Sequence, residues 1–199
     1  MTGGQGNDTF VVDNAGDVVT ETNATAASGG TDLVNASVTF TLGTNVESLT
    51  LTGSAAINGT GNALANVMTG NTGANTLGGG DGADTLTGGL GADRLTGGTG
   101  ADTFRFVTTG DGSDTITDFV SGTDKIYIVA ANFGLTAGSG ANLVINGTPS
   151  SAAAAFVYNS TTGVLGIDSD GNGAGAATQL ATLSNKPVGF KSSDFVLGA

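Results

Sequence analysis

The sequence predicts an all-β protein, a right-handed parallel β-roll or β-helix solenoid followed by a small β-rich C-terminal cap. The first observation is that large apolar residues recur at intervals of nine, at Met68, Leu77, Leu86, Leu95 and Phe104. The second is that the residues between them are mostly glycine and aspartate, in a chain with 36 glycines and two prolines. The third is that the other apolar residues occur in short runs with threonine neighbours, which favours strands over helices.

The repeat unit explains why so many glycines are compatible with an ordered chain. Residues 61–105 read GNALANVMT, GNTGANTLG, GGDGADTLT, GGLGADRLT and GGTGADTFR, and residues 3–11 read GGQGNDTFV. Because glycine adopts positive φ without strain, the first six residues of G-G-x-G-x-D-x-U-x predict a tight turn. The last three predict a short strand whose middle residue alone faces inward. Two units then form one flattened coil, and each turn stacks on the turn two units later.

Stacking places acidic side chains over one another. The chain carries 17 Asp and Glu against five Lys and Arg, a net charge of −12, and the coil places Asp84 over Asp102 and Asn75 over Asp93. At the strand spacing of about 4.8 Å, two carboxylates repel by about 3 kcal/mol at an effective dielectric constant of about 20. Ca²⁺ accepts about six to eight carboxylate and carbonyl oxygens in irregular geometry, and Mg²⁺ fits such a site less well. We therefore expect several Ca²⁺ ions between the stacked turns, in place of much of a hydrophobic core.

These units resemble the repeats of the RTX (repeats-in-toxin) family of secreted bacterial proteins, which form a parallel β-roll. In that family each ion is bound by carbonyls of the glycine turn and by the aspartate at repeat position six. The resemblance implies a first site from Gly79, Gly80, Asp81, Gly82 and Asp84 with Gly98, Gly100 and Asp102. It implies a second from Gly88, Leu90 and Asp93 with Asp111 and Asp114, and a third from Asn75 with Gly89, Gly91 and Asp93.

Two units depart from the consensus, because Asn66 and Asn75 replace the aspartate and Ala63 and Leu64 replace the x-G pair. An asparagine supplies a neutral oxygen, so amide hydrogen bonds along the stack are an alternative to calcium there. Residues 9–57 lack the nonapeptide but keep a rhythm of strands and turns, and we interpret them as wider coils of the same solenoid.

Further acids are candidate ligands outside the repeats. At the N-terminal end, Asp8, Asp13, Asp17 and Asp32 are candidates for one ion, with solvated turns as the alternative for Asp17 and Asp32. Residues 114–128 resemble the segment that closes RTX β-rolls; Asp118 and Asp124 are candidate ligands there, with Lys125 neutralising part of the charge.

The last seventy residues differ in composition. Residues 156–158 and 164–167 flank the polar turn NSTTG, which predicts a hairpin. Asp168, Asp170 and Asn172 match the start of an EF-hand loop, but no glutamate stands at loop position twelve, so both an Asx turn and bound Ca²⁺ stay open. The tail SSDFVLGA resembles a type I secretion signal. We divide the chain into a roll, residues 1–130, with its nonapeptide core at 61–105 and a closing segment at 106–130, and a cap, residues 131–199.

Several function classes are disfavoured. Without histidine or cysteine, the chain lacks Ser-His-Asp triads and thiolate or imidazole metal sites. Five basic residues are too few for a nucleic-acid surface, and no apolar run is long enough to span a membrane. No N-terminal signal peptide is recognisable and no cap precedes the first repeat, so we expect a piece of a longer protein or a docking end.

The sequence therefore predicts a secreted, non-enzymatic calcium-binding module that folds outside the cell and supports type I secretion of a parent exoprotein, with the exporter as a partner during export. The alternative is an adhesive or surface-layer building block that contacts other copies, a cell surface or a glycan. Less favoured are an accessory module of an exported protease, lipase or epimerase, and an ice-binding solenoid, since Arg94 and Arg105 interrupt the threonine faces.

Overall fold

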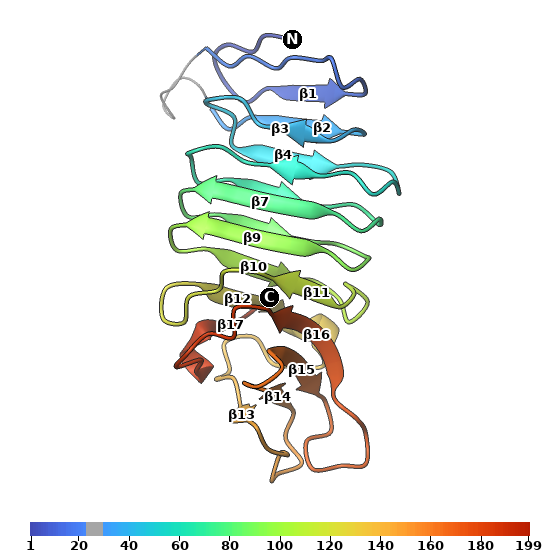
Figure 1. Ribbon diagram of the computed structural model, residues 1–199, viewed down its shortest axis with the longest axis vertical. Coiled ribbons are helices and arrows are strands. Elements are labelled where there is room, and N and C mark those ends of the chain that lie inside the picture. Colours follow the sequence, from blue (N-terminus) through green and yellow to red (C-terminus); the bar gives the residue numbers. More distant parts are fainter. Residues whose placement is uncertain (23–29) are drawn as a thin grey trace.

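The computed structural model describes residues 1–22 and 30–199. Within them, two long β-sheets run the length of the molecule, and the chain passes between them in successive coils that stack from the N-terminus toward the cap (Figure 1). In the described residues the only helices are two short 3-10 turns, η1 (Ala130–Phe133) and η2 (Ser192–Asp194). The fold is thus a parallel β-roll, as the repeat spacing predicts.

The first sheet is parallel throughout and contains the strand of every second repeat. Its eight strands, in spatial order, are β1 (Thr9–Val12), β2 (Leu33–Ala36), β4 (Ser48–Leu51), β6 (Val67–Thr69), β8 (Thr85–Thr87), β10 (Thr103–Phe106), β12 (Lys125–Val129) and β17 (Phe195–Gly198). The last strand of the chain therefore lies beside a strand that ends 66 residues before it begins.

The second sheet contains the alternate strands of the roll and continues into the cap. Its nine strands, in spatial order, are β3 (Phe40–Thr41), β5 (Gly59–Thr60), β7 (Thr76–Asp81), β9 (Arg94–Thr99), β11 (Asp114–Ile116), β16 (Thr178–Leu183), β15 (Val164–Asp168), β14 (Ala155–Tyr158) and β13 (Leu143–Ile145). Pairing is parallel up to β16 and antiparallel from β16 to β14. The predicted hairpin is confirmed by the β14–β15 pair.

The strand register confirms the coil of two repeats. Leu77 lies beside Leu95, and Met68, Leu86 and Phe104 lie in one row, each pair 18 residues apart. Each of these side chains is at most 1% exposed, whereas the residues on either side of them, apart from the buried Thr87, are exposed or half-buried. One inward side chain per repeat forms a core that is a single row wide on each sheet.

The coils before the repeats are irregular in length. Thr9 lies beside Leu33, Leu33 beside Ser48, and Ser48 beside Val67, so successive coils take 24, 15 and 19 residues. The expectation of coils in the same solenoid is confirmed, but only the first is markedly wider than a repeat coil.

Aromatic rings pack together where the cap meets the roll. Phe190 packs edge-on against Phe119 with ring centroids 5.5 Å apart, and it also contacts Tyr158 and Phe195. Phe156 stacks on Phe195 at 4.3 Å. Because β16 and β17 add one strand to each sheet of the roll, the cap closes the solenoid by continuing it; the boundary at residue 130 stays a prediction. No helix in the described residues is long and apolar enough to cross a membrane.

Candidate metal site along the turn edges

One position in the coil is acidic or an amide at each of the eight levels of the first sheet. It is the residue that immediately precedes each strand and ends the turn before it. In order along the sheet these residues are Asp8, Asp32, Glu47, Asn66, Asp84, Asp102, Asp124 and Asp194. We call this row the first ladder. Parallel in-register pairing brings its members together, although they are spread over nearly the whole sequence.

Hydrogen bonds join successive members of the first ladder. The backbone N–H of Asn66 donates to Asp84 Oδ1 at 2.7 Å, and that of Asp84 donates to Asp102 Oδ1 at 2.9 Å. The N–H of Asp102 donates to Asp124 Oδ1 at 3.0 Å. Each carboxylate thus uses one oxygen to hold the preceding turn, and the predicted stacking of Asp84 on Asp102 is confirmed.

The second sheet has a corresponding but shorter row, Asn75, Asp93 and Asp114, which we call the second ladder. The N–H of Asn75 donates to Asp93 Oδ1 at 2.7 Å, and that of Asp93 donates to Asp114 Oδ1 at 2.9 Å. All three residues are at most 2% exposed. The predicted placement of Asn75 over Asp93 is therefore confirmed as well.

Glycines let the turns approach closely enough for these bonds. Gly98 and Gly100 have φ values of 105° and 145°, which side chains other than glycine rarely adopt. A Cβ on either would overlap the carbonyl oxygen of Gly80 or Gly82 in the turn beneath. The glycine spacing therefore sets both the backbone conformation and the distance between turns, and it stacks carbonyl groups close to the ladder carboxylates.

The second oxygen of the ladder aspartates is the unusual feature of the site. Asp84 Oδ2 and Asp93 Oδ2 are fully buried and have no hydrogen-bond partner in the described residues. Burial raises the pKa of Asp84 to about 6 and of Asp114 to about 8; hydrogen bonds from Asn66 and Asp93 act against this, and neighbouring carboxylates add to it. Burial likewise raises the pKa of Asp93, Asp102 and Asp124. The carboxylates are thus held where their ionised form lacks a counter-charge.

In the turns 61–66 and 70–75, which we call the amide turns, asparagine stands at the ladder position and its polar side-chain atoms form hydrogen bonds within the protein. Asn66 Nδ2 donates to the carbonyls of Val46 and Glu47 at 3.1 and 3.2 Å, and Asn75 Nδ2 donates to Ile57 O at 2.7 Å. The predicted alternative of amide bonds along the stack is therefore present. Asn75 Oδ1 also accepts the Asn71 N–H at 2.9 Å, so both of its polar side-chain atoms are bonded within the protein.

The asparagines at repeat position two, Asn62 and Asn71, also hold these turns by side-chain hydrogen bonds. The sequence analysis did not predict a role for them. Asn62 Nδ2 donates to Gly43 O and Val46 O at 2.7 and 2.8 Å. Asn71 Nδ2 donates to Thr52 O and Ala55 O at 3.1 and 3.0 Å. The signal was the pair N-x-x-x-N, which takes the place of G-x-x-x-D in these two units.

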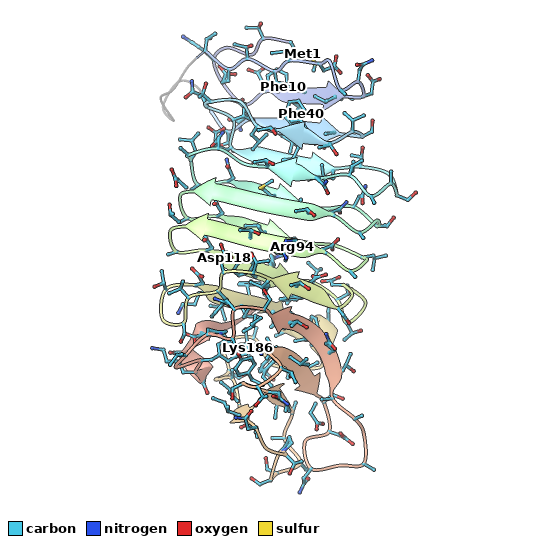
Figure 2. All side chains as sticks on the ribbon, viewed as in Figure 1. Met1, Phe10, Phe40, Arg94, Asp118 and Lys186 are labelled. Atoms are coloured by element: carbon cyan, nitrogen blue, oxygen red, sulfur yellow. The ribbon has the colours of Figure 1, made fainter. Side chains whose placement is uncertain are left out.

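The other predicted ligands around the repeats already have partners. Asp81 accepts from Thr99 Oγ1 at 2.7 Å, and Asp118 accepts the N–H groups of Gly97 and Gly98 at 3.0 and 2.8 Å (Asp118 is labelled in Figure 2). Asp111 accepts the N–H groups of Val107 and Thr108. Lys125 directs its ammonium to the carbonyl of Ser193 at 3.0 Å.

At the N-terminal end the structure groups Asp8 and Asp32 with Glu21, which sequence reasoning missed. One carboxylate oxygen of each lies within 4.8 Å of the others. Burial raises the pKa of Asp32, and the charges of Glu21 and Asp8 add to the effect. The predicted partners Asp13 and Asp17 belong to a separate turn, where Asp17 Oδ2 accepts the Asp13 N–H at 3.3 Å.

The donor set along the ladders suits a hard divalent cation. It consists of carboxylates and backbone carbonyls, the oxygen ligands that Ca²⁺ prefers. The buried, unpartnered oxygens of Asp84 and Asp93 are the atoms that such an ion would neutralise. The residues present therefore fit Ca²⁺.

Comparison with known families matches the repeats to one family, described as the RTX calcium-binding nonapeptide repeat (four copies), over residues 60–95 and 69–104. The comparison with curated proteins gave no match. Among solved structures, the chain is similar to the solution structure of the AlgE6R3 subunit from the Azotobacter vinelandii mannuronan C5-epimerase. The two are 26% identical with a TM-score of 0.46, and the similarity covers 80% of this chain and 82% of the other.

Proposed function

Because the chain carries RTX calcium-binding nonapeptide repeats, we propose that it is a non-enzymatic folding module of an exported bacterial protein, switched on by extracellular calcium. The repeats bind Ca²⁺; the proposal concerns what that binding does. The observation that carries it is the pair of buried carboxylate oxygens of Asp84 and Asp93 without a donor. A coil of this kind is incomplete without a cation.

We assign the ion-holding role to the four acids stacked around the repeat turns, Asp84 with Asp102 and Asp93 with Asp114, together with carbonyls of the glycine turns. Bound Ca²⁺ supplies positive charge and accepts about six to eight oxygens. The protein's part is to use one oxygen of Asp84 and of Asp93 to hold the preceding turn and to leave the other oxygen buried without a partner.

The concentration of calcium then decides whether the roll forms. Extracellular calcium modules bind at about 10⁻⁴–10⁻³ M, far above the free calcium inside a cell. Metal binding to a site that exists only in the folded state is folding free energy, so the chain stays unfolded during export and folds outside. An unfolded chain is also the form that fits a narrow exporter.

The proposed secretion signal is consistent with this order of events. Residues 195–198 form β17, where Phe195 and Leu197 are at most 8% exposed and pair with β12. Asp194 is fully buried and accepts the Gly122 N–H and the Ser121 hydroxyl at 2.9 and 2.7 Å. An exporter therefore reads this tail only before folding. Once outside, the tail and the aromatic cluster of the cap provide a first level on which the acidic coils assemble.

The test is a calcium titration of the full chain followed by circular dichroism, with magnesium as the control. We expect strand signal to appear cooperatively with calcium and not with the same concentration of magnesium. Full strand signal in excess chelator would overturn the proposed switch. Light scattering during the same titration separates this module from a self-assembling surface-layer block, which would grow in mass as calcium is added.

A further inference from the structure

The connection between β15 and β16, residues 169–177, lies in the cap, at the opposite end of the molecule from the N-terminus (Figure 1). The end of β15 and the start of this loop have the sequence IDSDGNGAG (residues 167–175). Asp168 ends β15, and Asp170 stands two residues later. This loop belongs to neither ladder. The nonapeptide repeats and the function proposed for them leave its two acids without a role.

Asp168 is the first of two independent observations in this loop. It is 7% exposed, and its Oδ1 is buried without a hydrogen-bond partner in the described residues. Isolated buried carboxylates are strongly disfavoured, because ionisation in a low-dielectric environment requires a counter-charge or donors. A buried acid at the end of a strand that turns into a glycine loop therefore needs an explanation that packing alone does not give.

The path of the loop around Asp170 is the second observation. Asp170 Oδ2 accepts the Gly175 N–H at 3.1 Å, and the Asp170 carbonyl accepts the Gly173 N–H at the same distance. A Cβ on Gly173 would overlap the Asp170 carboxylate, and one on Gly171, at φ 61°, would overlap the carbonyls of Ser151 and Ala153. The loop thus folds back on the Asp170 carboxylate, two residues after the buried Asp168.

We propose that Asp168 and Asp170 hold one Ca²⁺ in the β15–β16 loop, a site separate from the repeat turns. The buried Oδ1 of Asp168 and the carboxylate of Asp170 supply the charged oxygens, and loop carbonyls and water complete the coordination. Ca²⁺ fits better than Mg²⁺ because the donors are carboxylate and carbonyl oxygens in the irregular geometry of a glycine loop. Zinc is disfavoured because the chain has no histidine or cysteine.

Because β16 joins the cap to the second sheet of the roll, an ion in the β15–β16 loop also affects the roll. β16 is antiparallel to β15 on one side and parallel to β11 on the other, where Ala181 lies beside Asp114 of the second ladder. An ion that orders the β15–β16 loop therefore also orders β16, the strand that pairs with β11 beside Asp114. This role rests on the proposed function, but the site itself does not.

The test counts ions and observes the loop in the full-length chain. Native mass spectrometry gives the number of bound calcium ions, and ¹⁵N–¹H NMR follows the amides of Gly171, Gly173 and Gly175 during a calcium titration. The variant is Asp170→Asn, because Asp170 is exposed and its replacement leaves the packed interior intact. The control is Asp84→Asn, which removes the same charge from the first ladder.

We expect Asp170→Asn to bind one calcium ion fewer than the wild type and to lose the calcium-induced shifts of the loop amides. Asp84→Asn should retain those shifts. An unchanged ion count in Asp170→Asn, or wild-type loop amides that do not respond to calcium, would overturn the loop site. If Asp84→Asn loses an ion and Asp170→Asn does not, the loop site fails while the calcium role of the repeats stands.

Discussion

The amide turns at 61–66 and 70–75 stack in register on the acidic turns at 79–84 and 88–93, 18 residues later, yet the two kinds of turn satisfy their polar atoms in different ways. In the amide turns, the side-chain N–H groups of Asn62, Asn66, Asn71 and Asn75 donate to carbonyls of the preceding coil. In the acidic turns, the corresponding carboxylates have nothing to donate, and Asp84 Oδ2 and Asp93 Oδ2 are left without a partner. The amide N–H groups thus stabilise the amide turns through hydrogen bonds, whereas the stacked carboxylates need the positive charge of a bound cation.

The backbone differs along with the side chains. Gly80, Gly89 and Gly98 at repeat position two have φ values of 110°, 93° and 105°, whereas Asn62 and Asn71 at the same position are not in the positive-φ region. Position two therefore either adopts the left-handed conformation as glycine or places an amide against the preceding turn. The two kinds of turn are alternative solutions, and each requires a matched pair of residues at positions two and six.

Removing the acids should give the largest effect. The double variant Asp84→Ala/Asp93→Ala loses two proposed ligands and the acceptors of the Asn66 and Asn75 N–H groups. Each buried N–H left unpaired costs about 1–3 kcal/mol. If each lost ligand weakens the binding of its own ion tenfold, or about 1.4 kcal/mol, the calcium midpoint measured by circular dichroism rises about tenfold.

The matched control for that variant is Asp84→Asn/Asp93→Asn, which keeps the acceptor oxygens and removes the buried charge. It should bind fewer ions but retain more strand signal in chelator than the wild type. Equal calcium midpoints in the alanine variant and the wild type would remove both acids from the proposed ligand set.

An amide substitution should have a smaller effect that does not depend on calcium. Asn75→Ala leaves Ile57 O without its donor and the Asn71 N–H without its acceptor, which we expect to lower the free energy of unfolding by about 1–3 kcal/mol. Denaturant titrations at saturating calcium measure this loss, and the ion count should not change. A reduced ion count would show that Asn75 is a ligand, as the third predicted site requires.

Conversion of one kind of turn into the other is the sharpest test of the comparison. Asn62→Gly/Asn66→Asp restores the G-x-x-x-D pair beneath Asp84, whose Oδ1 already accepts the residue 66 N–H. We expect one additional bound calcium ion in native mass spectrometry and a less stable metal-free state. Asn62→Gly alone, the control, should lose stability without gaining an ion. A double variant with the wild-type ion count would mean that the two turns are not interchangeable.

The sequence predicted the parts of the fold that are encoded locally. The nine-residue spacing placed Leu77, Leu86 and Leu95 in the core because each repeat has one inward position, and the structure buries all three. The spacing also predicted which aspartates stack. It could not predict that β16 and β17 return from the cap to extend both sheets, because pairing across more than sixty residues leaves no local pattern.

The site was predictable only where the repeat is regular. Glu47, which accepts the Asp32 N–H at 2.8 Å, and Asp194 were missed as members of the first ladder because their coils do not follow the nonapeptide. The shorter pattern of an acid or amide two residues before a buried apolar residue identifies Glu47, which precedes Leu49, but not Asp194, because Val196 is exposed. Glu21 lacks even that signal, since it joins Asp8 and Asp32 through the irregular coil that precedes β2.

Acidity should also change the stability, and the sign of the change follows from the raised pKa values. The pKa of Asp84 is about 6 and that of Asp114 about 8 in the metal-free fold, against 3.8 for an ordinary aspartate. The folded state therefore binds more protons than the unfolded chain between about pH 4 and pH 8, and metal-free stability falls as the pH rises through that range. The amide turns have no such group and contribute no pH dependence.

Protons and calcium compete for the same oxygens, so acid should favour the fold in chelator and oppose calcium binding. The calcium midpoint should move to higher concentration between pH 8 and pH 6, and binding at pH 7 should release protons into a weakly buffered solution. Asp114→Asn should reduce that release, because Asp114 has the higher of the two pKa values. A calcium midpoint that does not change between pH 6 and pH 8 would show that calcium does not displace protons from the ladder carboxylates.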